Sequence, residues 1–283
     1  MTNIVSYNKT SDTNRGPSPS IWGNCPWMEI EAQVAQGGGG YTFWDDFVNH
    51  PSMAAGDTGK YGLYFDSGCL ANQAAAAGGV VALAQDGTDN DEIWLQAGGG
   101  HGSPFVISDT AGSDKKLWFE ARIKTSTIVD DVVALFVGLA EEGLTAVETK
   151  IDNTGAFADK DHIGFDSVHR NSGTAGTNAL VNVAYRLTGA TANTLITTAH
   201  TLVADTYVKL GFVYDPDAVA AKRIGFYVNG TEQTTYVTAT QIATSSGVAF
   251  PDGQTMTPTV GCKAGEGTAS TVSLDWWRVA QLG

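Results

Sequence analysis

The sequence has few basic residues. Its 283 residues include 16 Lys and Arg against 30 Asp and Glu, which gives a formal net charge of −14. Proteins bind a nucleic acid backbone through clustered basic side chains, and a chain this acidic would repel the phosphates. Because no basic cluster offsets the negative charge, we expect no nucleic acid partner.

Cysteine is also scarce. The chain carries only Cys25, Cys69 and Cys262, which are widely spaced and odd in number. A disulfide framework uses an even set of cysteines, and a zinc site uses closely spaced pairs. The three cysteines are therefore predicted to be buried, reduced thiols.

Long apolar runs are missing. No stretch approaches the roughly 18 apolar residues that a membrane-spanning helix needs. Residues 1–9 lack the basic start and apolar run of a signal peptide. We therefore expect a protein that is made in a cytoplasm and has no membrane partner.

The sequence is rich in strand patterns, and residues 207–236 show them most clearly. Large apolar residues fall on every second position in 208–214 and again in 224–228. This is the period of a strand that buries one face. Asn229-Gly230 favours a two-residue type I′ turn, and residues 234–237 would form the returning strand. Such a hairpin needs a second sheet to cover its apolar face, so a two-layer β fold follows.

Further strand patterns continue from residue 41 to the C-terminus, separated by turn residues at close spacing. We count about 13 or 14 strands, which favours one large sandwich over two small domains. Residues 41–283 are therefore assigned to a single β-sandwich.

The first 40 residues differ from the rest. Thr, Asn and Ser dominate, Pro17 and Pro19 are expected to break any regular structure, and four glycines at 37–40 end the segment. We predict that residues 1–40 form an extended N-terminal arm.

An aromatic cluster lies within this arm. Trp22, Pro26 and Trp27 carry an apolar area that a free polar tail does not accommodate. The cluster must dock, either on its own sandwich or on a neighbouring subunit. We assign these three residues to a partner interface.

Four segments together resemble the concanavalin A-like lectin/glucanase jelly roll. They are residues 43–47, residues 119–123, the hairpin of residues 209–230, and the last strand at 274–279. The resemblance covers about residues 41–283. It implies an all-β, concanavalin A-like jelly-roll sandwich of two antiparallel sheets, here preceded by an extended N-terminal arm. The family includes lectins, glycosidases, polysaccharide lyases and non-catalytic structural modules.

An acidic jelly roll with a tryptophan-bearing arm and no signal peptide also resembles the decoration, or cement, proteins of tailed bacteriophage capsids. That resemblance implies a non-enzymatic structural protein of the virion that stabilises the shell. Its partners would be the major capsid protein and copies of itself, as a homo-oligomer such as a trimer. One alternative is a lectin-like module of a tail fibre that binds a glycan. A less favoured alternative is a polysaccharide lyase or glycoside hydrolase.

Acidic residues at 159–166 are the candidates for a glycosidase site. The enzymatic branch of the concanavalin A-like family resembles family 16 glycosidases, which carry Glu-x-Asp-x-x-Glu along one strand. A retaining mechanism needs two carboxyls about 5–5.5 Å apart. The nearest string here contains Asp159 and Asp161, lacks the final acid, and continues to Asp166. We interpret it as a solvated loop that leads into a strand.

His162, Tyr185 and Arg186 are the residues that a lyase interpretation would use. The sequence strings that flank such a site in the family are absent here. We therefore assign no catalytic residue.

For a metal, residues 86–92 offer four carboxylates within seven positions. The segment lacks the glycine and the final acid of an EF-hand loop. We favour an acidic hairpin tip over a calcium-binding loop. The five histidines are scattered singly, at positions 50, 101, 162, 169 and 200, and we expect no metal ligand or cofactor.

Trp276 and Trp277 are neighbours on a predicted strand, so their side chains must face opposite sides. One is expected in the core. The other would cap the outer sheet face or lie in an interface.

Overall fold

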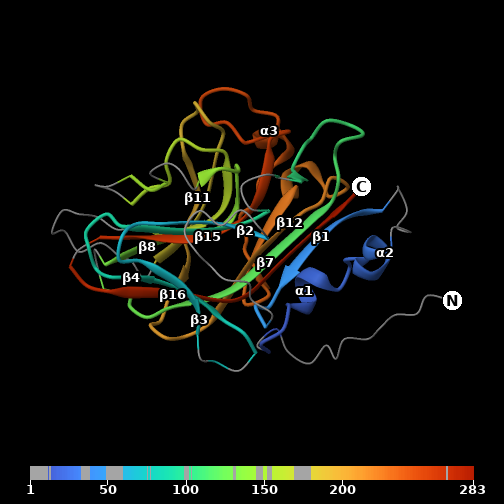
Figure 1. Cartoon of the computed structure of the whole chain (residues 1–283). Helices are drawn as coiled ribbons and strands as arrows, with labels where there is room; N and C mark the ends of the chain where they lie inside the picture. Colours follow the sequence, from blue (N-terminus) through green and yellow to red (C-terminus); the bar gives the residue numbers. More distant parts are fainter. Residues whose placement is uncertain are drawn as a thin grey trace.

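The computed structural model describes residues 12, 14–32, 39–48, 60–74, 76, 78–98, 102, 104–129, 132–144, 149–151, 155–168, 180–265 and 267–283. These residues form two stacked β-sheets with a few short helices at the periphery (Figure 1). No helix among them is long and apolar enough to cross a membrane.

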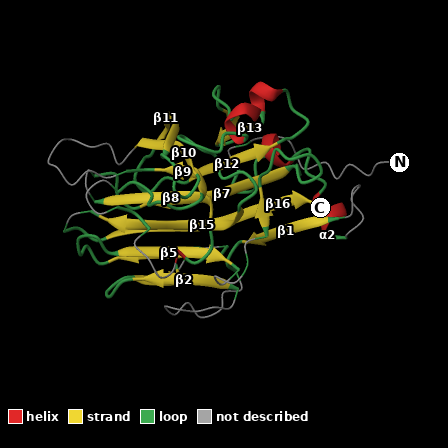
Figure 2. Cartoon of the chain, turned by 90° about the horizontal axis from the view of Figure 1, so that it is seen from above, coloured by secondary structure: helices red, strands yellow, loops and turns green. Residues whose placement is uncertain are grey.

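In the described part of the chain, two sheets, A and B, have eight strands each, and the strand pairings are antiparallel; Figure 2 shows the strands of sheet B. Sheet A has the order β14-β13-β12-β7-β16-β4-β3, with β1 also paired to β16. Sheet B has the order β11-β10-β9-β8-β15-β5-β2, with β6 also paired to β15. The predicted all-β sandwich of two antiparallel sheets is confirmed.

The strands have the following bounds. Sheet A contains β1 (Gly40–Asp45), β3 (Leu70–Gln73), β4 (Val81–Gln85), β7 (Leu117–Thr125), β12 (Val208–Tyr214), β13 (Ile224–Val228), β14 (Thr231–Glu232) and β16 (Ser270–Leu282). Sheet B contains β2 (Tyr61–Phe65), β5 (Glu92–Ala97), β6 (Phe105–Val106), β8 (Val133–Ala140), β9 (His162–Asp166), β10 (Leu180–Arg186), β11 (Asn193–Thr201) and β15 (Thr255–Ala264). The short helices are α1 (Pro19–Trp22), α2 (Trp27–Glu31), α3 (Ala239–Ile242) and the 3₁₀ turn η2 (Ala220–Lys222).

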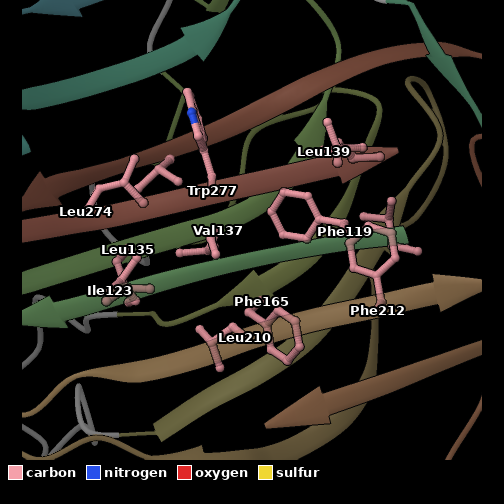
Figure 3. Packing of buried hydrophobic residues seen from close by; sticks show 14 of the residues in the cluster. Phe119, Ile123, Leu135, Val137, Leu139, Phe165, Leu210, Phe212, Leu274 and Trp277 are labelled. Atoms are coloured by element: carbon pink, nitrogen blue, oxygen red, sulfur yellow. The ribbon is translucent and has the colours of Figure 1, made fainter. Parts of the chain in front are cut away.

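The core lies between the two sheets and follows from the alternation along each strand. Phe119 of β7 stacks on Phe212 of β12, with ring centroids 5.1 Å apart. Val137 of β8 and Phe165 of β9 belong to the same buried cluster from the side of sheet B (Figure 3). Burial of this apolar area, at about 25 cal/mol per Å², is the main term that holds the two layers together.

The hairpin of β12 and β13 has the predicted turn. Asn229 and Gly230 have φ angles of 48° and 76°, as a type I′ turn requires. The predicted return strand at 234–237 is wrong, because the turn uses only two residues and the chain re-enters the sheet at once as β14. Val237 makes only an isolated bridge to Ile224.

The two neighbouring tryptophans of β16 face opposite sides, as predicted. Trp277 is fully buried in the core, where it packs against Phe43 and Tyr61. Trp276 lies on the outer face and its indole N–H donates to the carbonyl of Arg15, 2.7 Å away. The second tryptophan is therefore covered by the arm.

We predict that Gly230→Val destabilises the protein by about 1–3 kcal/mol, because a β-branched residue is strained at positive φ. An added Cβ at Gly230 would also collide with the Asp12 side chain. Urea unfolding measures the change. Gly16→Ala is the matched control, since a Cβ at Gly16 meets nothing within 4 Å, and it should change stability by less than about 0.5 kcal/mol. Equal stabilities of Gly230→Val and wild type would contradict the turn.

Candidate functional site: the docked arm and the outer faces of the sandwich

The described part of the arm contains two short helices, which corrects the expectation that Pro17 and Pro19 break any regular structure. Pro19 is the first residue of α1, a position where the missing N–H costs nothing because that group has no helical partner. Pro17 precedes the helix and leaves it intact. The arm is therefore not fully extended.

The arm lies across the outer face of sheet A. Ile21 of α1 and Ile30 of α2 are buried against Trp118 of β7 and Ala280 of β16. An added Cβ at Gly211 would lie 2.7 Å from the Ile21 side chain. The glycine thus leaves room for the arm to approach the sheet.

Charged groups fix the start of the arm. Arg15 donates from Nε to both carboxylate oxygens of Asp275, at 3.0 and 3.1 Å. Asp275 is almost fully buried and also pairs with Arg122 of β7. Because a buried carboxylate without partners is very costly, Arg15 and Arg122 together make the position of Asp275 tolerable.

Glu120 of β7 is the second polar anchor beneath the arm. One of its carboxylate oxygens accepts from the Ser18 backbone N–H at 2.9 Å and from the Trp22 indole N–H at 2.8 Å. The side chain is fully buried, and desolvation raises the pKa of its carboxyl. Lys209 of β12 donates to the carbonyl of Gly16 at 3.1 Å and lowers the cost of burying this charge.

The predicted interface residues pack on their own sandwich in the single chain. The Arg278 guanidinium of β16 lies 4.5 Å from the ring centre of Trp22 and 3.7 Å from that of Trp27. Pro26, between the two tryptophans in sequence, is half-buried. The structure thus brings Trp22, Pro26 and Trp27 together on sheet A, and their contact with a partner stays a prediction.

The outward side of the docked arm exposes further large apolar side chains. Met28 of α2 is 67% exposed, and Trp44 of β1 is 50% exposed and reaches over Arg278 at 5.3 Å. We call Trp22, Trp27, Met28 and Trp44 the arm surface. The sequence analysis did not single out Trp44. Its signal there is that it follows Phe43 on a predicted strand, so one of the two side chains must face away from the core.

The outer face of sheet B is covered as well, by a segment between β8 and β9. Leu144 and Phe157 of this segment pack against Trp94 of β5 and Phe136 of β8. These residues form a small apolar cluster outside the main core.

Two buried ion pairs lie beneath that segment. Lys150 pairs with Asp166 of β9, and its ammonium also donates to the carbonyls of Gly155 at 2.7 Å and Ser167 at 3.1 Å. The Lys150 side chain has no solvent exposure. Its three donors are therefore all used inside the protein.

Glu92 of β5 and Lys263 of β15 form the second pair, 3.0 Å apart. The Glu92 carboxylate also accepts from the Trp94 indole N–H at 2.6 Å and from the Thr149 backbone N–H at 2.9 Å. Both side chains are buried. The carboxylate thus ties the covering segment to the sheet.

The acids weighed as glycosidase catalysts are held by other partners. Asp159 pairs with Arg186 at 3.1 Å, and Asp161 accepts from the Thr188 backbone N–H at 2.7 Å. Asp166 is engaged by Lys150.

Of the three residues of the lyase interpretation, the structure brings two together and separates the third. His162 of β9 and Arg186 of β10 are cross-strand partners on the outer face of sheet B. Tyr185 points the other way, into the core, where its ring packs against Phe250.

The acidic segment at 86–92 connects β4 to β5. Asp86 accepts from the Thr88 backbone N–H at 2.8 Å, and Glu92 belongs to the buried pair described above. The described ranges contain no group of three His, Cys, Asp or Glu side chains arranged to hold a metal ion. His50, His101 and His169 lie outside those ranges. The three cysteines are free thiols, with Cys69 and Cys262 buried and Cys25 half-buried.

The sequence matches no protein-family profile, and a search of curated proteins gives no match. Solved structures, by contrast, share the fold. A protein of unknown function from Shewanella oneidensis MR-1 is 14% identical with a TM-score of 0.52, over 86% of this chain and 87% of that one. Peanut lectin with a 9-residue peptide is 12% identical with a TM-score of 0.52, over 86% and 97% of the two chains. An endo-β-1,4-glucuronan lyase from the fungus Trichoderma reesei is 9% identical with a TM-score of 0.50, over 84% and 94%.

These similarities define the class of fold. The chain has a concanavalin A-like jelly-roll fold, as the family resemblance of its sequence implied. At these identities the likeness concerns the fold alone, and both a lectin and a lyase have it.

We predict that Lys150→Met destabilises the protein by about 3–5 kcal/mol, because it leaves the Asp166 carboxylate buried without its counter-ion. The exposed pair of Lys124 and Asp205, 3.5 Å apart, supplies the control. Lys124→Met should cost no more than about 1 kcal/mol. Denaturant unfolding of both variants gives the comparison, and similar losses for the two would show that the Lys150 pair is not isolated from water.

A second prediction concerns pH. Burial between Phe136 and Phe157 lowers the pKa of His162 from 6.5 to about 3. Between these values the unfolded chain takes up a proton at this histidine and the folded protein does not, so the free energy of unfolding falls as the pH falls. From pH 6.5 to 4.5 this histidine accounts for a loss of about 2 kcal/mol.

The variant His162→Phe keeps an aromatic ring and removes the titrating group. From pH 6.5 to 4.5 the fall in its free energy of unfolding should therefore be smaller than the fall for the wild type by about 2 kcal/mol. Parallel urea titrations at several pH values measure the difference. Identical pH dependence in the two proteins would place His162 in contact with solvent.

Proposed function

We propose that this protein is a non-enzymatic structural protein of a virion, most specifically a decoration protein that cements a tailed-phage capsid. Its partners in this proposal are the major capsid protein and further copies of itself, as a homo-oligomer such as a trimer. The observation that supports it best is the arm surface. Met28 and Trp44 hold large apolar areas in solvent, and Trp22 and Trp27 are only half-buried beside them.

The composition of the arm surface suits protein recognition. Tryptophan, methionine and arginine are the residues enriched at the centres of protein interfaces. Here Trp22, Trp27 and Trp44 pack around Arg278, which restricts their side chains before binding and lowers the entropy cost of binding. Such a surface gives affinity that multiplies when many copies bind one shell.

The state of the acidic residues is consistent with a non-catalytic role. Glu92 and Asp166 are each engaged by a buried lysine, and Glu120 is engaged by donors of the arm. A retaining glycosidase needs a pair of carboxyls on either side of a bound sugar. These three carboxyls are instead covered by segments of the chain.

A lectin-like module that binds a glycan is the second candidate, and the likeness of the fold to plant lectins favours it. A glycan array separates the two candidates. Binding of the wild-type protein to a defined class of glycan would support the lectin-like role, and turnover of a polysaccharide would support a lyase or hydrolase.

We predict that the double variant Met28→Ser, Trp44→Ser stays folded but loses attachment to undecorated capsids by at least about tenfold, since two central apolar contacts of a few kcal/mol are removed. Co-sedimentation with capsids measures attachment, and light scattering measures oligomerisation. Val219→Ser is the control, because Val219 is 68% exposed in the loop between β12 and β13 and does not belong to the arm surface. Equal attachment of the double variant and the control would overturn the adhesive role of the arm surface.

A further inference from the structure

A groove of about 720 Å³ opens along β1, beside the ends of β5 and β6. Its volume is typical of a ligand site. The residues that line it are Ile30, Glu31, Gly40, Tyr41, Thr42, Phe43, Ala97, Gly98, Gly102, Pro104, Phe105 and Thr257. Four consecutive residues of β1 appear in this set. A sheet face presents only alternate residues of a strand, so the groove runs along the edge of β1.

That edge of β1 has backbone groups to offer. β1 pairs with β16 on one side, and no described strand pairs with its other side. The carbonyl of Gly39 accepts from the N–H of Gly283, 3.0 Å away, so residue 39 is a hydrogen-bonded position of the β1–β16 ladder. In an antiparallel pair the bonded residues alternate, so Thr42 and Trp44 direct their N–H and C=O groups away from β16.

The walls of the groove are mainly apolar. Tyr41 is 55% exposed, and Phe43, Pro104 and Phe105 line the groove beside it. The Thr257 hydroxyl already donates to the carbonyl of Ala97 at 2.8 Å. Thr42 offers its backbone groups to a ligand, and Glu31 offers an exposed carboxylate.

An open strand edge beside apolar walls is suited to an extended polypeptide, which forms ladder hydrogen bonds with its main chain and places alternate side chains in the groove. The charges beside the groove indicate what kind of polypeptide it binds. Glu29 and Glu31 are exposed next to the groove, so a second copy that paired edge to edge at this site would bring the same carboxylates to it. A segment with a Lys or Arg opposite Glu31 would be attracted.

We propose that this groove binds an extended, basic-apolar segment of a different protein, which adds a strand to the edge of β1 at Thr42 and Trp44. The segment places alternate apolar side chains against Tyr41 and Phe105, and a Lys or Arg against Glu31. The site adjoins the arm surface, since α2 borders both, but it uses the backbone edge of Trp44 and not its outward side chain. The inference does not depend on the capsid role.

The test uses the full-length protein and a displayed library of random ten-residue peptides. Synthetic copies of the enriched peptides should alternate apolar residues, contain a Lys or Arg, and bind with a Kd in the micromolar range. The variant Thr42→Pro removes the N–H that the added strand needs, and edge strands tolerate proline. It should weaken binding at least tenfold, whereas Thr42→Val, which keeps the N–H, should change the Kd less than twofold.

Two further measurements keep the test decisive if Thr42→Pro fails to fold. Hydrogen exchange of the Thr42 and Trp44 amides in the wild-type protein should slow at least tenfold when peptide is bound. Glu31→Lys should weaken binding of the basic peptides at least threefold. Failure to select any peptide, or unchanged exchange of both amides, would overturn the proposal. A second result would also overturn it. If the wild-type protein forms a dimer at higher concentration, and Thr42→Val keeps this dimer while Thr42→Pro abolishes it, the occupant of the groove is a second copy.

Discussion

Charged side chains buried outside the main core constrain this structure more than any other feature. In a β-sandwich the apolar residues between the sheets are covered by the opposite sheet, but here both outer faces also carry buried ions. Asp275 and Glu120 occupy one outer face, and Glu92 and Asp166 occupy the other. A buried charge that loses its partner costs several kcal/mol. Each outer face therefore needs a covering segment that supplies partners.

The two covers differ in what they present to solvent. The segment between β8 and β9 places Phe157 and Lys150 inward over sheet B. The arm over sheet A places Ile21 and Ile30 inward and leaves Met28 outside. An element that covers a buried carboxylate thus also supplies an apolar outer surface, which is why the proposed adhesive role is assigned to it.

The local features were predictable because short-range physics determines them. Asn229-Gly230 specifies its turn through backbone conformation alone, and the alternation in residues 208–214 specifies a strand. Strand β3 was not predicted, because Leu70–Gln73 has no apolar alternation and is a strand only through its pairing with β4. The helix at Pro19 was missed because the rule that proline breaks helices does not hold at the first helical position.

The site could be predicted only in part. The sequence indicated that Trp22 and Trp27 must dock, since exposed tryptophan forgoes the gain of burial. It could not show where, because Glu120 lies 102 positions after Ser18, and the outward direction of its carboxylate depends on the register of β7 in the sheet. The buried pair of Lys150 and Asp166 has the same character, since a lysine in a loop gives no local sign that it will be fully buried.

The central claim is that the arm is a fixed cover, held by the buried carboxylates of sheet A. Native-state hydrogen exchange of the Ser18 amide, which donates to Glu120, tests it most directly. The account predicts that this amide exchanges with a free energy of opening within about 2 kcal/mol of that for global unfolding. Exchange at nearly the rate of an unstructured peptide, while the amides of β7 stay protected, would contradict it.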